Sequence, residues 1–258
     1  MQSLESLFSL ENQTALVAGA SSGFGAHFAR LLAGQGARVV VAARRLDRLE
    51  TLVAELEADG AQAAAVELDV TRGESVRAAF DAAEQRFGPV TVVSNNAGVV
   101  DSKLAVDIEE DDWDRTLNTN LKGAWQVASE AGKRMIAANA SGSIVNTASI
   151  LGLRPALAQA SYATSKAALV HLTRCLALEW ARKGIRVNAL CPGFFVTDMN
   201  KDFLASERGQ RYLATTPAQR AGEFDELSAP FLLLATGAGS FITGETLAVD
   251  GGHRLSAL

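Results

Sequence analysis

The chain has 258 residues, of which 48% are hydrophobic, and a formal net charge of −5 at neutral pH. This length and apolar content predict a single domain over residues 1–258 with a sizeable buried core. The acidic balance argues against a nucleic-acid partner, because phosphate-backbone binding needs a basic surface. Residues 1–14 lack the basic start and apolar core of a signal peptide, and the apolar run 229–235 is too short to span a bilayer. We therefore expect a cytoplasmic protein that does not bind membranes.

Short apolar, β-branched runs alternate with longer amphipathic stretches along the chain. The runs predict seven strands, at residues 15–18, 39–42, 64–67, 90–94, 143–147, 185–190 and 246–249. Helical spacing predicts helices over residues 25–35, 46–58, 73–87, 108–138 and 161–182. This alternation is typical of βαβ units, so we predict an α/β fold: a doubly wound Rossmann-type domain with a seven-stranded parallel sheet flanked by helices.

A glycine-rich turn, Gly19-Ala-Ser-Ser-Gly23-Phe-Gly25, joins the first predicted strand to the first predicted helix. Glycine allows a tight turn and lets backbone N–H groups approach a pyrophosphate at the positive end of a helix. A helix cap or a simple loop could also carry glycines, but the strand before, the helix after and the following βαβ unit favour dinucleotide binding. The expected cofactor contacts in this turn are Gly19, Ser21, Ser22, Gly23, Phe24 and Gly25.

Two arginines, Arg44 and Arg45, follow the second predicted strand. NAD-binding sites usually place a carboxylate there to hold the ribose 2′-hydroxyl, and this chain has none. The arginines could be solvated surface residues, but cations near a helix N-terminus oppose its dipole, which suggests a compensating anion. We expect both to contact the 2′-phosphate, and the cofactor to be NADP(H) rather than NAD(H).

Tyr162 and Lys166 lie one helical turn apart, on one face of a predicted helix. A free tyrosine has a pKa of about 10, and an adjacent ammonium would favour its phenolate, which would make the phenol an acid–base catalyst. The pair alone could equally be a surface neighbour pair. The glycine turn and the missing acid after the second strand favour the catalytic interpretation.

Together these motifs resemble the short-chain dehydrogenase/reductase family over nearly the whole chain. The family fingerprint is matched from Ala18 to Gly25, its Asp-Val pair by Asp69-Val70, its Asn-Asn-Ala-Gly segment by Asn95 to Gly98, and its Pro-Gly segment by Pro192-Gly193. Its catalytic serine and tyrosine are matched by Ser149 and Tyr162, which are 13 residues apart. The resemblance implies that Asn120, Ser149, Tyr162 and Lys166 are catalytic. It implies further cofactor contacts at Asp69, Val70, Asn96, Ala97, Gly98, Tyr162, Lys166, Pro192, Gly193, Phe195 and Thr197.

The resemblance also implies roles for these residues. Ser149 would hydrogen-bond a substrate carbonyl oxygen and Tyr162 would protonate it, while Lys166 would favour the tyrosinate and hold the nicotinamide ribose. Asn120 would position a water that relays protons. We therefore expect an enzyme that interconverts a ketone and a secondary alcohol. The alternatives are a 3-oxoacyl thioester reductase, a sugar or polyol dehydrogenase, or a non-catalytic NADP(H)-responsive binding protein on the same fold. The family implies a homotetramer, with a dimer as the alternative.

Two positions depart from the family pattern. Ala18 stands where the fingerprint has threonine, which removes a hydroxyl that would tie the turn to the Asn-Asn-Ala-Gly segment. Restoring threonine is therefore expected to raise stability. Many NADP(H)-preferring relatives have a basic residue before the middle glycine, where this chain has Ser22. This leaves most of the cofactor discrimination to Arg44.

The expected substrate pocket is mostly apolar, which favours a small neutral or apolar carbonyl or alcohol as substrate. Its predicted walls are Val99, Val100, Ile150 to Leu153, Ala156, Gln159, Phe194, Phe195 and a variable segment from Lys201 to Tyr212. Residues 194–216 are expected to form a substrate lid, with 201–216 as its mobile part. The histidines and cysteines show no metal-ligand spacing, so we expect no metal. Both Cys175 and Cys191 are expected to be buried, and His27, His171 and His253 to be structural.

Overall fold

The computed structural model describes residues 3–197 and 200–255. Asp198 and Met199, which fall within the expected lid, lie outside the described residues, as do the outermost residues of the expected domain. Seven strands form one parallel sheet in the order β3-β2-β1-β4-β5-β6-β7. They are β1 (Thr14–Ala18), β2 (Arg38–Ala43), β3 (Ala63–Glu67), β4 (Val90–Asn95), β5 (Gly142–Thr147), β6 (Ile185–Pro192) and β7 (Thr246–Val249). The predicted sheet is confirmed.

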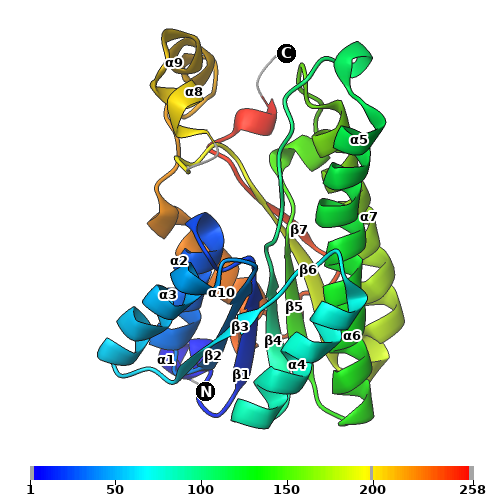
Figure 1. Ribbon diagram of the computed structural model, residues 1–258. Coiled ribbons are helices and arrows are strands. Elements are labelled where there is room, and N and C mark those ends of the chain that lie inside the picture. The colour runs from blue at the N-terminus through cyan, green and yellow to red at the C-terminus, as the bar shows by residue number, and fades with distance from the viewer. Residues whose placement is uncertain (1–2, 198–199, 256–258) are drawn as a thin grey trace.

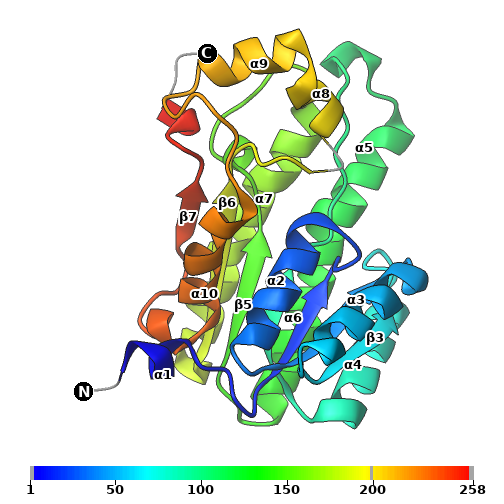
Figure 2. The same ribbon diagram turned by 90° about the vertical axis from the view of Figure 1, so that its left-hand side faces the viewer.

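Helices cover both faces of the sheet (Figures 1 and 2). On one face lie α2 (Gly23–Gly34), α3 (Leu46–Ala58) and α10 (Ser228–Ala235), with the short α1 (Leu4–Phe8) near its lower end. On the other lie α4 (Gly73–Phe87), α6 (Ala124–Ala137) and α7 (Ala160–Trp180), and α5 (Glu110–Leu117) extends this layer upward. Two short helices, α8 (Lys201–Ala205) and α9 (Glu207–Ala214), lie beyond the carboxyl ends of the strands. This is the doubly wound α/β arrangement that the sequence predicts.

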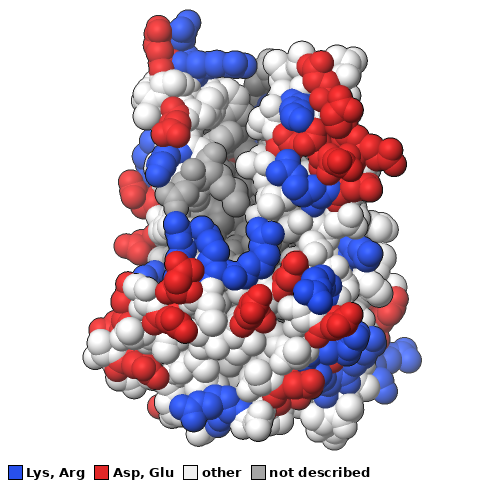
Figure 3. All heavy atoms as spheres, in the orientation of Figure 1, with Lys and Arg blue, Asp and Glu red and all other residues white. Residues whose placement is uncertain are grey.

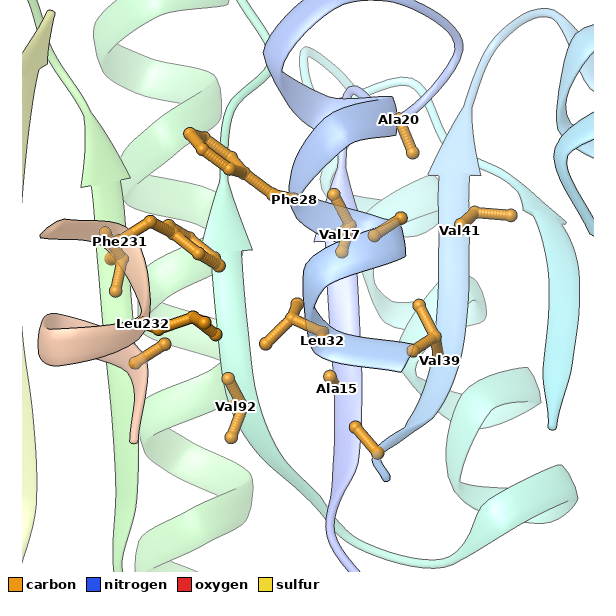
Figure 4. Close-up of a cluster of buried hydrophobic side chains, with 14 of the residues drawn as sticks. Ala15, Val17, Ala20, Phe28, Leu32, Val39, Val41, Val92, Phe231 and Leu232 are labelled. Atoms are coloured by element: carbon orange, nitrogen blue, oxygen red, sulfur yellow. The ribbon is translucent and has the colours of Figure 1, made fainter. Parts of the chain in front are cut away.

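Each face of the sheet has its own apolar core, because the central strands are buried on both sides. β1 is buried along its whole length. On the α2 side, Phe28 of α2 and Phe231 of α10 stack with ring centroids 4.0 Å apart, above Val17 and Val92 of the sheet (Figure 4). The two faces are therefore packed independently, and the ends of the strands are held in fixed positions.

The helix predicted over residues 108–138 is interrupted. It begins at Glu110, and residues Asn118–Gly123 form a π-helical segment, η2, before α6 continues. Gly123 packs directly on Val70, where a Cβ would lie 2.7 Å from Val70 Cγ2. The wider turn also aims the buried Asn120 side chain at the backbone of Val99. π-segments inside helices occur frequently at functional sites.

The sequence pattern does not predict α1, α8, α9 or α10. The first three have five to eight residues, too few to show a helical period. α10, with the sequence SAPFLLLA, is apolar on nearly all sides because it lies against the sheet and α2. A uniformly apolar segment has no amphipathic period to detect.

Candidate active site

The chain reverses its strand order between β1 and β4, so a crevice opens at the carboxyl ends of these neighbouring strands. The glycine turn follows β1, the segment Asn96 to Gly98 follows β4, and Ser149 follows β5. The first turns of α7 carry Tyr162 and Lys166. Most residues predicted for the site therefore lie at one end of the sheet, and Figure 3 shows a hollow on the surface of the molecule toward this end.

The glycine turn is packed so closely that two of its glycines have no room for a side chain. At Gly19, where φ is +84°, a Cβ would lie 2.7 Å from the backbone nitrogen of Ala97. A Cβ at Gly25 would overlap the Gly19 carbonyl oxygen. At Gly23, with φ +57°, a Cβ would meet no described atom within 4 Å, and the Ser22 side chain accepts no capping hydrogen bond from the described start of α2. The turn thus presents an open helix N-terminus that fits a pyrophosphate.

The turn is tied to the Asn-Asn-Ala-Gly segment even though threonine is missing at position 18. The Asn96 backbone N–H donates to the Ala18 carbonyl oxygen at 3.0 Å. Its side-chain Nδ2 donates to the Gly19 carbonyl oxygen at 3.1 Å. Asn95 points into the protein and donates to the Ala124 carbonyl oxygen at 2.8 Å and to Asn146 Oδ1 at 3.0 Å. The connection expected of a threonine hydroxyl is therefore made by Asn96.

Basic side chains surround the ends of β2 and β3. Arg45 Nη2 donates to Ser21 Oγ at 2.7 Å and to Ser22 Oγ at 3.2 Å, which joins the loop after β2 to the glycine turn. Burial opposes the ionisation of Asp69, but hydrogen bonds from Thr71, with the nearby cations Arg44 and Arg72, hold the pKa of Asp69 below its usual value. Lys and Arg side chains gather along the lower edge of the hollow (Figure 3). This end of the crevice favours an anionic ligand group.

Ser149, Tyr162 and Lys166 converge at the ends of β5 and β6. Lys166 is 4% exposed, and its Nζ donates to the Thr147 carbonyl oxygen at 2.8 Å. The same Nζ lies 5.7 Å from the centroid of the Tyr162 ring. Ser149 is buried, and its Oγ accepts a hydrogen bond from the Leu151 N–H at 3.1 Å. The serine and the tyrosine thus stand together, with the lysine beneath the phenol ring.

The protonation states differ from the sequence-based expectation. Burial raises the pKa of Tyr162, and the hydrogen bond to Ser149 offsets only part of this effect. Burial also lowers the pKa of Lys166 to about 8. The sequence predicts that the ammonium favours the phenolate, whereas in this structure burial is the largest influence on the pKa of Tyr162. The phenol is therefore a proton donor at neutral pH.

Asn120 is fully buried, and its amide is occupied by the protein. Its Oδ1 accepts from the Val99 N–H at 2.8 Å, and its Nδ2 donates to the Val99 carbonyl oxygen at 2.8 Å and to Ser165 Oγ at 3.1 Å. Ser165 Oγ in turn donates to the Tyr162 carbonyl oxygen at 2.7 Å. Asn120 therefore joins the loop after β4 to the helix that carries Tyr162. The expected water relay remains a prediction.

Several of the residues expected to contact the cofactor could do so mainly through backbone atoms, because their side chains are packed or hydrogen-bonded within the protein. Phe195 is 3% exposed, and its ring packs on Phe24 with centroids 5.6 Å apart. Gly193 approaches Asp250 so closely that a Cβ would lie 2.7 Å from its Cα. Thr197 bonds to Asn200, with the Thr197 N–H donating to Asn200 Oδ1 at 2.8 Å. Val70 is buried, and its carbonyl oxygen accepts from Gln126 Nε2 at 2.9 Å.

An aromatic cluster joins the segment 194–216 to the C-terminal turn. Its members are Phe194, Phe203, Tyr212 and His253, with ring centroids 5.2 to 6.3 Å apart. Tyr212 Oη and His253 Nε2 form a hydrogen bond of 2.8 Å, and burial lowers the pKa of His253. The sequence pattern could not reveal this contact, because the two residues lie 41 positions apart and neither belongs to a motif.

Two further expectations concern metals and cysteines. Among residues 3–197 and 200–255, no group of three or more His, Cys, Asp or Glu could hold a metal ion. Within the same residues, no helix has the length and apolar character needed to cross a membrane. Cys191 is buried as predicted, but the prediction for Cys175 is wrong, because it lies on the exposed side of α7.

Comparison with known proteins agrees with this geometry. Residues 19–254 match a family model described as Enoyl-(Acyl carrier protein) reductase. The chain is 36% identical over 242 residues to the 3-oxoacyl-[acyl-carrier-protein] reductase FabG of Staphylococcus epidermidis, covering 93% of this chain and 98% of that protein. It is 39% identical over 253 residues to the galactitol 2-dehydrogenase (L-tagatose-forming) of Cereibacter sphaeroides, covering 96% and 98%.

The chain belongs to the short-chain dehydrogenase/reductase family. The structure of a gluconate 5-dehydrogenase from Burkholderia cenocepacia in complex with NADP and tartrate superimposes with a TM-score of 0.94 at 34% identity. The match covers 99% of this chain and all of that one. Enzymes of this family use a nicotinamide cofactor to interconvert carbonyl and hydroxyl groups. The family, the fold and the oxidoreductase class predicted from the sequence are confirmed.

Proposed function

We propose that this oxidoreductase uses NADP(H), in preference to NAD(H), to interconvert a small ketone and the corresponding secondary alcohol. The observation that carries the proposal is the convergence of Ser149, Tyr162 and Lys166 below the crevice that the glycine turn borders. The open N-terminus of α2 fits the cofactor pyrophosphate. When bound, the cofactor supplies or accepts the hydride.

The side chains divide the remaining chemistry. The Ser149 hydroxyl holds the substrate oxygen, and Tyr162, protonated because burial raises its pKa, delivers the proton to that oxygen in the reductive direction. In the oxidative direction the tyrosine must first lose its proton. Lys166 places a positive charge near the ring when protonated. Asn120 holds the loop after β4 against α7 and so keeps Tyr162 in position.

The preference for NADP(H) rests on the arginines after β2. No acid follows β2, and Arg44 and Arg45 stand where a carboxylate would hold the ribose 2′-hydroxyl of NAD. Arg45 is already held against the serines of the glycine turn. The Burkholderia cenocepacia relative, which was solved with NADP, supports the same assignment.

The substrate is proposed to be a small neutral or apolar carbonyl compound or alcohol. Residues 194–216 would act as its lid, since Phe194, Phe203 and Tyr212 form an aromatic surface beyond the strand ends. Two relatives, named as a 3-oxoacyl reductase and a galactitol dehydrogenase, act on substrates of very different polarity. The family chemistry is therefore compatible with thioester, polyol and simple ketone substrates.

We also propose that the chain assembles as a homotetramer through the face formed by α5, α6 and α7, with a dimer as the alternative. Trp125 of α6 and Leu178 of α7 are 47% and 83% exposed. Leu117, Leu121, Trp125 and Leu172 line an apolar groove between these elements. Burial of such side chains by a second copy would remove them from water.

The decisive test is a panel of ketones, 3-oxoacyl esters, sugars and polyols with NADPH and with NADH, followed by loss of cofactor absorbance. Tyr162→Phe should lower turnover of any active substrate by about 100-fold or more, with NADPH affinity unchanged, because only proton transfer is removed. Turnover within about tenfold of the wild type would contradict the acid–base role. Complete inertness across the panel with tight NADPH binding would instead favour a cofactor-binding protein.

A further inference from the structure

A second concave feature lies on the outer side of the glycine turn. It is a cavity of about 400 Å³ bordered by Ser21, Ser22 and Gly23 of the turn, by α2, by the first turns of α3 and by Phe224. The proposed hydride-transfer site does not use it. Ser21 and Ser22, which line it, are the same serines that accept hydrogen bonds from Arg45, so the cavity adjoins a residue of the loop after β2.

The cavity also contains Arg48, which has a different environment from the other arginine there. Arg30 is paired with Glu55, with Nη2 and Oε2 2.5 Å apart. Among the described residues, Arg48 forms no ion pair or side-chain hydrogen bond with an acid, and neither do Arg44 and Arg45. The cavity therefore has one neutralised cation and one that is available to a ligand.

Arg48 lies close in sequence to the two arginines that follow β2. Arg45 is the N-cap of α3, which begins at Leu46, and Arg48 lies three positions after it in the first turn of the helix. Together with Arg44 they place three guanidinium groups at the positive end of α3, where cations are unfavourable. Asp47 is the acid in that first turn. A bound anion would compensate the remaining positive charge.

We propose that Arg48 is a second determinant of NADP(H) specificity, and that it binds the 2′-phosphate from the cavity side while Arg44 and Arg45 bind it from the loop after β2. The proposal rests on the proposed NADP(H) preference. The geometry explains why Ser22 can replace the basic residue found at this position in many NADP(H)-preferring relatives. A small side chain at position 22 leaves the rim open toward α3, and the charge is supplied from Arg48.

The test is cofactor binding without substrate, measured by fluorescence titration with NADPH and NADH. Arg48→Gln should weaken NADPH binding by about tenfold, the usual contribution of a charge-assisted contact. The affinity for NADH should stay within about twofold of the wild-type value. Adenosine 2′,5′-bisphosphate should lose affinity in the same way, whereas AMP should not. Arg48→Lys should retain part of the NADPH affinity, because it keeps the charge but not the planar fork. The matched control is Lys183→Gln, which removes an exposed cation from the turn before β6.

The possible results distinguish a failure of the role proposed for Arg48 from a failure of the proposed NADP(H) preference. Equal weakening of NADPH and NADH, or NADPH affinity unchanged by Arg48→Gln, would overturn the role of Arg48. If Arg44→Ala then still removes the selectivity for NADPH, the proposed function stands and only this inference fails. If neither Arg44→Ala nor Arg48→Gln alters the ratio of the two affinities, the NADP(H) preference is wrong as well.

Discussion

The glycine turn after β1 and the segment 194–216 border the same crevice, but they are held in different ways. In the turn, backbone packs on backbone: Gly19 lies against Ala97, Gly25 lies against Gly19, and Asn96 bonds to both Ala18 and Gly19. In the described part of 194–216, the main links to the C-terminal turn are aromatic side chains, with one hydrogen bond between Tyr212 and His253. At Gly19 and Gly25 the turn therefore cannot accept a side chain unless the backbone moves. The contacts among Phe194, Phe203 and Tyr212, in contrast, are made by side chains.

The largest effect is expected from Gly25→Ala. The new Cβ would overlap the Gly19 carbonyl oxygen, so the backbone of the turn must move. A displacement of this kind should weaken cofactor binding by about 100-fold or more, with a loss of about 1–3 kcal/mol in stability. Fluorescence titration with NADPH and thermal unfolding measure the two effects.

The matched control for this change is Gly34→Ala in the same helix. A Cβ at Gly34 would meet no described atom within 4 Å, and alanine is the better helix former, so the melting temperature should stay the same or rise. Cofactor affinity should not change. If Gly25→Ala behaves like Gly34→Ala, the turn is not held by backbone contact and the comparison fails.

A smaller and different effect is expected from Phe203→Ala in α8. Phe203 is 37% exposed and contributes ring contacts to Phe194 and Tyr212 rather than to the core. We expect KM for the substrate to rise by about tenfold, with kcat and NADPH affinity nearly unchanged, because only ground-state contacts are removed. A large loss of NADPH affinity would mean that the two sides are not independent.

The two tyrosines of the chain report on the two sides separately. Tyr162 lies beside the crevice and Tyr212 in the segment 194–216, and burial raises the pKa of both. In the single-tyrosine variant Tyr212→Phe, ultraviolet titration without cofactor should show phenolate formation only above the ordinary pKa of about 10. Half-titration below that value would show that Lys166 outweighs burial. Tyr162→Phe gives the corresponding curve for Tyr212.

The contrast between the glycine turn and the segment 194–216 also explains which features could be predicted from the sequence. The strands, the glycine turn and the pair Tyr162 and Lys166 depend on local periodicity and spacing, and the structure contains them within a few residues of the predicted positions. The π-segment at Asn118–Gly123 depends on the packing of Gly123 against Val70 and of Asn120 against Val99, which no local pattern encodes. Spacing identifies Lys166 as the charged neighbour of Tyr162, but it does not reveal the burial that raises the pKa of Tyr162.

The segment 194–216 is the least predictable part for a related reason. α8 and α9 are too short for a period, and the contact between Tyr212 and His253 joins residues that are distant in sequence. The sequence also gives no signal for the role proposed for Arg48, because only the structure shows the cavity that this exposed helix residue shares with Ser22. Side-chain contacts across elements are fixed by tertiary packing, not by local propensity.

The smallest effect is expected from Ala18→Thr, and here the structure reverses the sequence-based expectation. The threonine hydroxyl would add a hydrogen bond worth about 1 kcal/mol, but Asn96 already makes the connection from two donors. Ala18 is fully buried in the core beneath the turn, so two added heavy atoms must be accommodated at a cost of about 1–3 kcal/mol. The cost equals or exceeds the gain, so we expect the melting temperature not to rise. A clear increase would show that the turn still has room for a side chain at position 18, and that its backbone contacts are less tight than those at Gly19 and Gly25.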